Sequence, residues 1–319
     1  MDIVCLLTGL GLILAGANML TDGASDIARR YGVSDLVVGL TVVAFGTSAP
    51  EFIISLLSAI DGNTGIAIGN VVGSNIFNIL AIVGVTALVR PIKVEKSILT
   101  ADIPLVVLSA LALLAMGSGP WLGDGSARIL SRSDGIILLL FFTVFMRYTF
   151  AQAKTAPSAP DAVASKPPMP FWKGVLWVLL GLAGLIFGGN LFVGGASGIA
   201  RSLGVSDALI GLTIVAAGTS LPELATSVVS AVKGKPGIAI GNVIGSNIFN
   251  IFLVLGASAT VRPLPFGEIG ESDLIVLALA CIAFWLMGAF FRRRTFTRPE
   301  GALLLIAYIA YTWHLIASL

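Results

Sequence analysis

Residues 32–51, GVSDLVVGLTVVAFGTSAPE, return later in the chain as GVSDALIGLTIVAAGTSLPE at residues 204–223. A second block, GIAIGNVVGSNIFNI at residues 65–79, returns as GIAIGNVIGSNIFNI at residues 237–251. A shift of 172 positions aligns both blocks, and 33 of the 53 residues in 32–84 are identical to their counterparts in 204–256. The two halves of the chain are therefore expected to share one fold.

The composition predicts that both halves lie in lipid. Of the 319 residues, 56% are hydrophobic and only 11% are charged, whereas a soluble domain carries about 25% charged residues. Ten apolar runs are long enough to span a bilayer, and their continuity indicates helices rather than the alternating strands of a barrel. The first run follows no basic segment, so we expect a retained helix and not a signal peptide. The runs lie near residues 3–24, 35–60, 66–89, 98–116, 134–150, 172–196, 207–232, 238–261, 272–291 and 301–318.

A polar segment separates the two halves. Residues 152–170 contain five prolines among Ala, Ser, Lys and Asp, a composition typical of a linker. The predicted division is a first repeat at 1–151, the linker at 152–170 and a second repeat at 171–319. Each repeat holds five spans, an odd number, so the second repeat would cross the membrane in the opposite direction. The predicted fold is an all-α membrane protein of ten transmembrane helices in two inverted five-helix repeats, as in secondary transporters with a midplane substrate site.

The distribution of basic residues predicts the orientation. Fifteen of the nineteen Lys and Arg residues fall on the side of the membrane that holds the linker. By the positive-inside rule, the linker is cytoplasmic and both termini are outside, in the cell (inner) membrane. The net charge of +2 gives no reason to expect a nucleic-acid partner. The lipid bilayer is the expected partner, and the sequence indicates no protein partner.

Two acidic residues stand inside predicted spans, at equivalent positions of the repeat. Glu51 lies in the second span and Glu223 in the seventh, with no basic residue nearby in either run. Because a charge at the bilayer centre costs roughly 2.5–3.5 kcal/mol on insertion scales, such residues usually have a functional role. The compensating charge is expected to be a bound cation.

A proline precedes each acid, in the runs Gly-Thr-Ser-Ala-Pro and Gly-Thr-Ser-Leu-Pro. Proline removes a backbone donor, so the carbonyls of Gly46 and Gly218 lose their helical partners. The distortion is also expected to expose the carbonyls of Ala44 and Ala216. Carbonyl, hydroxyl and carboxylate oxygens together would suit Ca²⁺ and other hard cations.

The third and eighth spans are predicted to supply the facing surface of this site. Ser74 and Asn78 are four residues apart and share one helical face, and Ser246 and Asn250 repeat that spacing. Glycines on the same spans would let the backbones approach closely. An asparagine one turn earlier extends each polar stripe: Asn70 and Asn242.

These blocks resemble the alpha repeats of the Ca²⁺/cation antiporter superfamily, and most of all its prokaryotic sodium/calcium exchangers. The signatures are GTSAPE with GSNIFN and GTSLPE with GSNIFN, and the resemblance covers nearly the whole chain. It implies an antiporter rather than an enzyme, which carries Ca²⁺ and Na⁺ by alternating access and needs no cofactor. The glycine-rich first and sixth spans resemble gating helices that slide past a fixed core.

The resemblance also implies a set of ion ligands. Ca²⁺ would bind to the carboxylates of Glu51 and Glu223 and to the main-chain oxygens of Thr47 and Thr219. Some family members have aspartate where this chain has Asn250, so the Na⁺ stoichiometry stays open. The Na⁺ sites would draw on Ala44, Ser48, Ser74, Asn78, Ala216, Ser220, Ser246 and Asn250.

Three other functions compete with Na⁺/Ca²⁺ exchange. A Ca²⁺/H⁺ antiporter of the same superfamily would use the glutamates to trade Ca²⁺ for protons, and a further variant would also require K⁺. Neutral oxygen ligands around the glutamates favour Na⁺ over the proton. A cation channel is disfavoured, because channels commonly build their pores from symmetric subunits. No phosphate loop or nucleophile–base set indicates a soluble enzyme.

Overall fold

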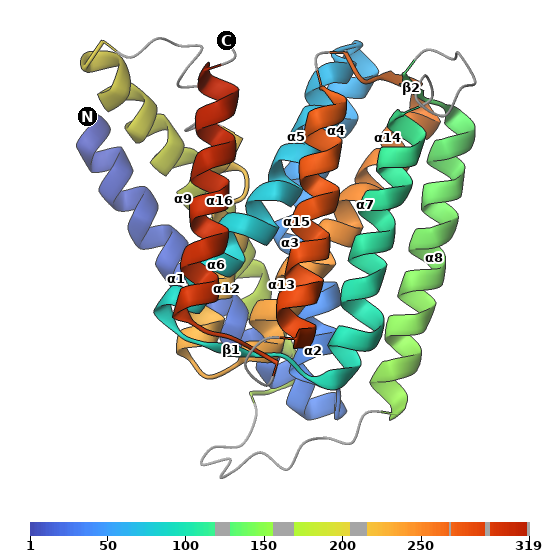
Figure 1. Ribbon diagram of the computed structural model, residues 1–319. Helices are drawn as coiled ribbons and strands as arrows, with labels where there is room; N and C mark the ends of the chain where they lie inside the picture. The colour runs from blue at the N-terminus through green and yellow to red at the C-terminus, as the bar shows by residue number, and fades with distance from the viewer. Residues whose placement is uncertain (119–127, 156–168, 205–215, 268, 291–293, 318–319) are drawn as a thin grey trace.

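The computed structural model describes residues 1–118, 128–155, 169–204, 216–267, 269–290 and 294–317. Helices make up most of this part and form one bundle (Figure 1). Eight helices among the described residues are long and apolar enough to cross a membrane, and a bent pair, Asp35–Thr47 with Ala49–Asp61, is a ninth candidate. Much of the predicted seventh span, 207–232, lies outside the described residues, so the ten-helix inverted repeat stays a prediction.

Two long antiparallel helices, α1 (Asp2–Tyr31) and α9 (Phe171–Ser202), lie side by side at one edge of the bundle (Figure 1). A Cβ atom built on Gly9 would lie 2.7 Å from the Gly188 carbonyl oxygen, and one on Gly16 would lie 2.7 Å from the Gly181 carbonyl oxygen. The two backbones therefore touch, as glycine-rich membrane helices do. These glycines pack the predicted gating helices against each other, whereas Gly11 has no neighbour within 4 Å of its Cβ position.

Two helical segments form the centre of the bundle. The apolar stretch within Thr64–Val89 is 78% buried and the one within Pro236–Val261 is 94% buried, against 17% for the peripheral helices α8 and α16. These central segments carry the Gly-Asn-Val-x-Gly-Ser-Asn motifs. Each contains a π-helical stretch: α5 (Thr64–Ile76), η2 (Phe77–Ile82), α6 (Val83–Val89), and α13 (Pro236–Ile248), η5 (Phe249–Leu255), α14 (Gly256–Val261).

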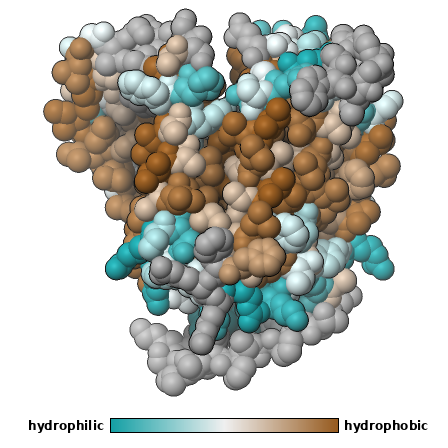
Figure 2. All heavy atoms as spheres, in the orientation of Figure 1, coloured by the Kyte–Doolittle hydropathy of each residue, from teal (hydrophilic) through white to brown (hydrophobic). Residues whose placement is uncertain are grey.

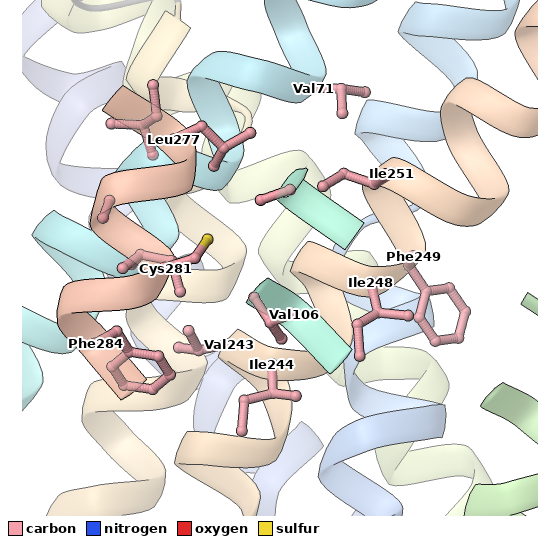
Figure 3. Close-up of a cluster of buried hydrophobic side chains, with 14 of the residues drawn as sticks. Val71, Val106, Val243, Ile244, Ile248, Phe249, Ile251, Leu277, Cys281 and Phe284 are labelled. Atoms are coloured by element: carbon pink, nitrogen blue, oxygen red, sulfur yellow. The ribbon is translucent and has the colours of Figure 1, made fainter. Parts of the chain in front are cut away.

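The remaining helices pack around this centre. In Figure 3, Cys281 and Phe284 lie on one side, Ile248 lies on the other, and Val106 and Ile244 lie between them in one apolar cluster. Cys281 is a free, buried thiol, and Cys5 is free and half-buried, as expected for unpaired cysteines. These helices are α2 (Asp35–Val38), η1 (Gly39–Val43), α3 (Ala44–Thr47), α4 (Ala49–Asp61), η3 (Ile98–Asp102), α7 (Ile103–Gly117), α8 (Arg132–Thr155), α11 (Ala216–Gly218), α12 (Leu221–Val232), α15 (Glu271–Phe290) and α16 (Arg298–Ala317).

Glycines end two of the helices in the first half. Gly32 follows α1 with φ 65°, and its N–H bonds the carbonyls of Ala28 and Arg29. Gly62 follows α4 with φ 89° in the same left-handed conformation. An L side chain rarely adopts this conformation, so these glycines fix where the chain turns back toward the bundle.

Two short antiparallel ladders join the halves, one at each end of the bundle (Figure 1). Strand β1 (Ile92–Lys93) pairs with β4 (Thr295–Phe296), and β2 (Ile129–Leu130) pairs with β3 (Leu264–Pro265). The sequence analysis did not predict these strands, because two residues are too few to show a period. Each ladder ties a connection in one half to the opposite connection in the other half.

An apolar belt crosses the middle of the bundle, with hydrophilic residues toward the ends (Figure 2). Several helices extend past this belt, so the predicted ends need correction. Helix α1 continues to Tyr31 beyond the predicted span 3–24, and α9 continues to Ser202 beyond 172–196. Helix α8 runs to Thr155, so the first four residues assigned to the linker are helical. They include good helix formers, and the first proline after them is Pro157.

Candidate ion-binding site

The helix that carries Glu51 breaks just before it. Ser48 leaves the helical conformation, with φ −83° and ψ 5°, and the segments on either side are bent by 48°. Pro50 has no N–H to give the carbonyl of Gly46, as the sequence predicted. In the other half Ser220 has nearly the same conformation, with φ −92° and ψ 8°, and Pro222 stands four residues after Gly218.

The prediction of a freed Ala44 carbonyl is wrong. Its oxygen accepts the N–H of Ser48 at 3.0 Å, and the Thr47 hydroxyl lies 3.4 Å from it. The helix ends late enough for Ser48 to complete this last bond, because Pro50 removes only the partner of Gly46. Ala216, the counterpart of Ala44, opens α11 at the edge of the described residues.

The two glutamates are joined crosswise between the halves. The Ser48 hydroxyl donates to Glu223 Oε1 at 3.1 Å, and the Ser220 hydroxyl donates to Glu51 Oε1 at 3.3 Å. Each glutamate is 1% exposed. Both Oε2 atoms are buried, and the described residues give neither a hydrogen-bond partner. The two motifs therefore form one buried acidic centre with two free carboxylate oxygens.

Asparagines of the central helices hold both acidic helices in place. Asn70 Nδ2 donates to the Glu51 carbonyl at 3.3 Å and to Ser55 Oγ at 2.9 Å. Asn242 Nδ2 makes the same pair of bonds to the Glu223 carbonyl at 3.2 Å and to Ser227 Oγ at 3.0 Å. The sequence analysis placed both asparagines on the polar stripe, and the structure gives them this positioning role.

Asn242 also accepts a hydrogen bond from a residue of the first half. The Thr47 hydroxyl donates to Asn242 Oδ1 at 3.0 Å, so this residue of the first motif touches a central helix of the second half. Thr47 is 1% exposed. Of the predicted ligand residues, Thr47, Ser48 and Glu223 thus belong to one hydrogen-bonded set through Asn242, and Ser220 and Glu51 belong to its counterpart through Asn70.

The other predicted side chains meet where the two central helices cross. Asn250 Nδ2 donates to Ser74 Oγ and to Asn75 Oδ1, both at 3.0 Å. Asn75 Nδ2 in turn donates to the Asn247 carbonyl at 3.2 Å. The sequence analysis missed Asn75 and Asn247, although the GSN triplet of each motif contains them. Their short spacing from the serine gave no reason to place them on the same face.

Among the predicted ligand residues of the two central helices, three buried oxygens have no hydrogen-bond partner in the described part of the chain: Asn78 Oδ1, Asn250 Oδ1 and Ser246 Oγ. Asn78 and Asn250 are each the second residue of a π-helical stretch, η2 and η5. Such stretches disturb the normal helical bonding and often occur at functional sites. Together with the two glutamate oxygens, they give a set made only of oxygen atoms.

Among the described residues, no cationic side chain balances the two acids. None of the ion pairs between described residues involves Glu51 or Glu223. The part of the chain that the structure describes also contains no group of three His, Cys, Asp or Glu residues placed to hold a metal. Oxygen ligands without nitrogen or sulfur suit hard cations such as Ca²⁺ and Na⁺ rather than zinc.

A third buried acid lies outside this network. Asp102, at the end of η3, is 0% exposed, and neither carboxylate oxygen has a hydrogen-bond partner among the described residues. The sequence analysis did not single it out, although it falls within the predicted span 98–116. It provides an internal comparison for the roles of Glu51 and Glu223.

Comparison with known sequences finds transporters over nearly the whole chain. The family model described as sodium/calcium exchanger protein matches residues 1–151 and 173–317. A putative antiporter, CaxA of Alkalimonas amylolytica, is 39% identical over 99% of this chain and 98% of its own. The inner membrane protein YrbG of Escherichia coli (strain K12) is 37% identical over 88% of this chain and 87% of its own. The sodium/calcium exchanger MaX1 of Methanosarcina acetivorans is 33% identical over 97% of both chains.

The fold also matches a solved exchanger. A structure of the sodium-calcium exchanger NCX_Mj, soaked with Na⁺ and Sr²⁺, superimposes with a TM-score of 0.83 at 33% identity. The match covers 100% of both chains. The similarity therefore includes both halves of the molecule.

Proposed function

This chain belongs to the sodium/calcium exchanger family, and we propose that it is a secondary antiporter that exchanges Ca²⁺ for Na⁺ across the membrane. The crossed pair of Glu51 and Glu223 carries this proposal. Each acid comes from a different half, and each keeps one unpartnered, buried oxygen. Two ionised carboxylates together match the charge of one Ca²⁺.

The proposed Ca²⁺ ligands are both carboxylates and the main-chain oxygens of Thr47 and Thr219. Coulomb attraction to a divalent ion is about twice that to a monovalent ion at equal distance, so the acids favour Ca²⁺. The Ala44 carbonyl, already hydrogen-bonded, should contribute least. Na⁺ would bind among the neighbouring oxygens of Ser48, Ser74, Asn78, Ala216, Ser220, Ser246 and Asn250.

The neutral oxygens support Na⁺ rather than the proton as the coupling ion. A proton needs one carboxylate oxygen, whereas Na⁺ needs several ligands to replace its water. Asn78 Oδ1, Asn250 Oδ1 and Ser246 Oγ are buried without a partner, at a cost of roughly 1–3 kcal/mol each unless a ligand satisfies them. Bound Na⁺ would remove that cost when Ca²⁺ leaves.

We further propose that ten helices form two inverted repeats, and that α1 and α9 move together across the core to expose the acids to each side in turn. Their backbone-to-backbone contact would let them move as one unit. The inner membrane is the proposed location, with the 152–170 linker in the cytoplasm and both termini outside. A cysteine at Ser133 should then react with an impermeant thiol reagent in intact cells lacking Cys5 and Cys281, whereas one at Ser97 should not. The reverse labelling pattern would overturn the orientation.

Ca²⁺ uptake into proteoliposomes tests the coupling ion. Vesicles receive in turn an outward Na⁺ gradient, a proton gradient and a K⁺ gradient, each with Ca²⁺ outside. We expect uptake only with the Na⁺ gradient. Uptake driven by the proton gradient alone would make the chain a Ca²⁺/H⁺ antiporter, and a requirement for K⁺ with Na⁺ would identify the K⁺-dependent type. Single-channel currents from the same protein would contradict antiport.

A further inference from the structure

A cavity opens at the end of the bundle that carries β1 and β4, and none of its lining residues belongs to the acidic centre. Its volume is about 620 Å³, and it lies where the first turns of η3 and α7 meet the end of α15. Two basic side chains, Lys96 and Arg294, stand at its rim. Leu99, Pro104 and Ala289 give it an apolar wall. The cavity thus combines a cationic rim with an apolar wall.

The side chains of these two basic residues have no hydrogen-bond or ion-pair partner among the described residues. Both are exposed, and neither takes part in the ion pairs among described residues. Arg294 has a positive φ of 64°, the only such value for a non-glycine residue in the described chain. Its conformation is held by the ladder, because the Val94 N–H donates to its carbonyl at 2.8 Å. Unfavourable backbone conformations of this kind cluster at functional sites.

The opposite end of the molecule provides a comparison. Arg128 precedes β2 as Arg294 precedes β4, and its carbonyl accepts the Phe266 N–H at 3.0 Å in the same way. The Arg128 side chain, however, makes contacts within the protein. Its Nε donates to the Gly117 carbonyl at 2.8 Å, and its guanidinium lies 5.3 Å from the centre of the Phe266 ring. In the sequence, the counterpart of Lys96 under the shift of 172 is Glu268. The residues that match Lys96 and Arg294 at the other end therefore do not form a second pair of free basic side chains.

A tryptophan fixes the depth of the cavity in the bilayer. Trp285 lines it, and its indole N–H donates to the Leu99 carbonyl at 3.0 Å. Tryptophan with one polar and one apolar edge is typical of the membrane–water interface. Neighbouring side chains on the outer surface are apolar, with Leu108 and Leu286 exposed. The rim would then lie at headgroup level and the wall at the level of the acyl chains.

We propose that this cavity binds the headgroup of an anionic phospholipid, with its phosphate between Lys96 and Arg294 and an acyl chain along Leu99, Pro104 and Ala289. Basic pockets between helices on the cytoplasmic side recognise such lipids, and arginine with lysine matches a phosphate by charge and hydrogen bonding. This site is independent of the ion-binding site, and its test does not depend on transport.

Native mass spectrometry of the purified protein tests the site, with phosphatidylglycerol and phosphatidylcholine as the probes. We expect the parent to retain one phosphatidylglycerol in preference to phosphatidylcholine. In the double variant Lys96→Gln and Arg294→Gln, retention of phosphatidylglycerol should fall roughly tenfold or more, because two charged contacts to the phosphate are lost. The matched control, Arg30→Gln with Lys173→Gln, removes two exposed charges from the same end but outside the cavity and should bind like the parent.

Three results would overturn the proposal. The double variant could retain phosphatidylglycerol as the parent does, or the control variant could lose it equally, which would show a general surface-charge effect. Displacement of the lipid by millimolar inorganic phosphate would show a soluble-anion site instead, because phosphate makes no contact with the apolar wall. All four substitutions are at exposed positions, so unfolding should not obscure the comparison.

Discussion

The contact between α1 and α12 differs from the one that their repeat counterparts, α9 and α4, could form. Thr21 Oγ1 lies 2.9 Å from Ser230 Oγ, and both residues are 0% exposed. Lys233 Nζ lies 2.8 Å from Asp22 Oδ1 and also donates to the Asn18 carbonyl at 3.2 Å. We call these contacts the α1–α12 latch. They join α1 to the last turn of α12, the helix that carries Glu223.

The equivalent positions in the other half cannot make this latch. Under the shift of 172, Thr21 corresponds to Val193 and Asp22 to Gly194, which have no hydroxyl and no carboxylate. The counterpart of Lys233 is Asp61, of opposite charge. Ser58, the counterpart of Ser230, is only half-buried. One end of the protein is thus latched by polar contacts and the other is not.

This difference separates two roles within the repeats. The proposed ion ligands are shared: the acids, the serines before them and the asparagines of the central helices are identical in both halves. The latch residues differ between the halves. In an inverted repeat with identical contacts at both ends, the two access states would have equal free energy. We infer that the shared residues set ion affinity and that the latch biases the equilibrium between access states.

The largest expected effect comes from the shared acids. Either Glu51→Gln or Glu223→Gln removes one of the two negative charges that would hold Ca²⁺ in a buried site. Breaking a buried pair of opposite charges costs about 3–5 kcal/mol. Na⁺-driven Ca²⁺ uptake should fall at least about 100-fold in both variants. Asp102→Asn is the matched control, since it neutralises a buried acid outside the crossed pair, and it should keep exchange near the parent rate. Robust exchange by Glu51→Gln would contradict the site assignment.

A smaller loss is expected at the asparagines that position the acids. Asn242→Ala removes donors to Glu223 and Ser227 and also the nearer of the two acceptors of the Thr47 hydroxyl, whereas Asn70→Ala removes only two described bonds. Buried polar groups left unsatisfied cost about 1–3 kcal/mol. Thermal unfolding in detergent should therefore show both variants destabilised, with Asn242→Ala the more affected. Equal midpoints for the parent and Asn242→Ala would contradict the positioning role.

The sequence predicted the general form of this site but not its connections. The kink at Pro50, the burial of both acids and the pairing of the halves follow from residue types and from the repeat. The crosswise bonds from Ser48 to Glu223 and from Ser220 to Glu51 do not, because they depend on how the halves pack. The same is true of the Asn75 bond to the Asn247 carbonyl.

The helices were predicted more completely than their ends and interruptions. Long apolar runs located the described spans, since length and hydrophobicity suffice for that. The ends of α1 and α9 were placed too early, because polar turns of a helix can continue beyond the lipid. The π-helical stretches η2 and η5 carry no distinct sequence signal, because they lie within apolar segments that continue on both sides.

A substitution at Asn250 would make the proposed ion ligands differ between the two halves. Asn250→Asp adds a third acid to one half while Asn78 stays an amide in the other. If the new acid is ionised, it strengthens the attraction for cations, and if it is protonated it does not, so transport should gain a pH dependence. We expect a change of about severalfold in initial Ca²⁺ uptake between pH 6 and 8 relative to the parent. Overlapping pH profiles would place Asn250 outside the ion cluster.

The smallest effect is expected from the latch. Thr21→Val with Asp22→Gly copies Val193 and Gly194 into the first half and removes one buried hydrogen bond and the partly exposed ion pairs of Asp22 with Lys233 and Lys235. The hydrogen bond is worth about 0.5–1.5 kcal/mol and each ion pair about 0–1 kcal/mol, so the access equilibrium should shift at least about twofold toward opening at the linker end. In a background without native cysteines, a cysteine at Thr226 should label faster from that end in the latch variant. Unchanged labelling would show that the latch does not bias the states.

Calorimetric titration of Ca²⁺ into the purified protein tests the central claim most directly, because it measures the crossed acids without transport. In Na⁺-free buffer the account predicts about one Ca²⁺ bound per chain, displaced by added Na⁺ but not by the same concentration of K⁺ or choline. It also predicts that Glu51→Gln and Glu223→Gln bind no measurable Ca²⁺ while Asp102→Asn binds it as the parent does. Ca²⁺ binding that survives in both glutamine variants, or that Na⁺ fails to displace, would contradict the account.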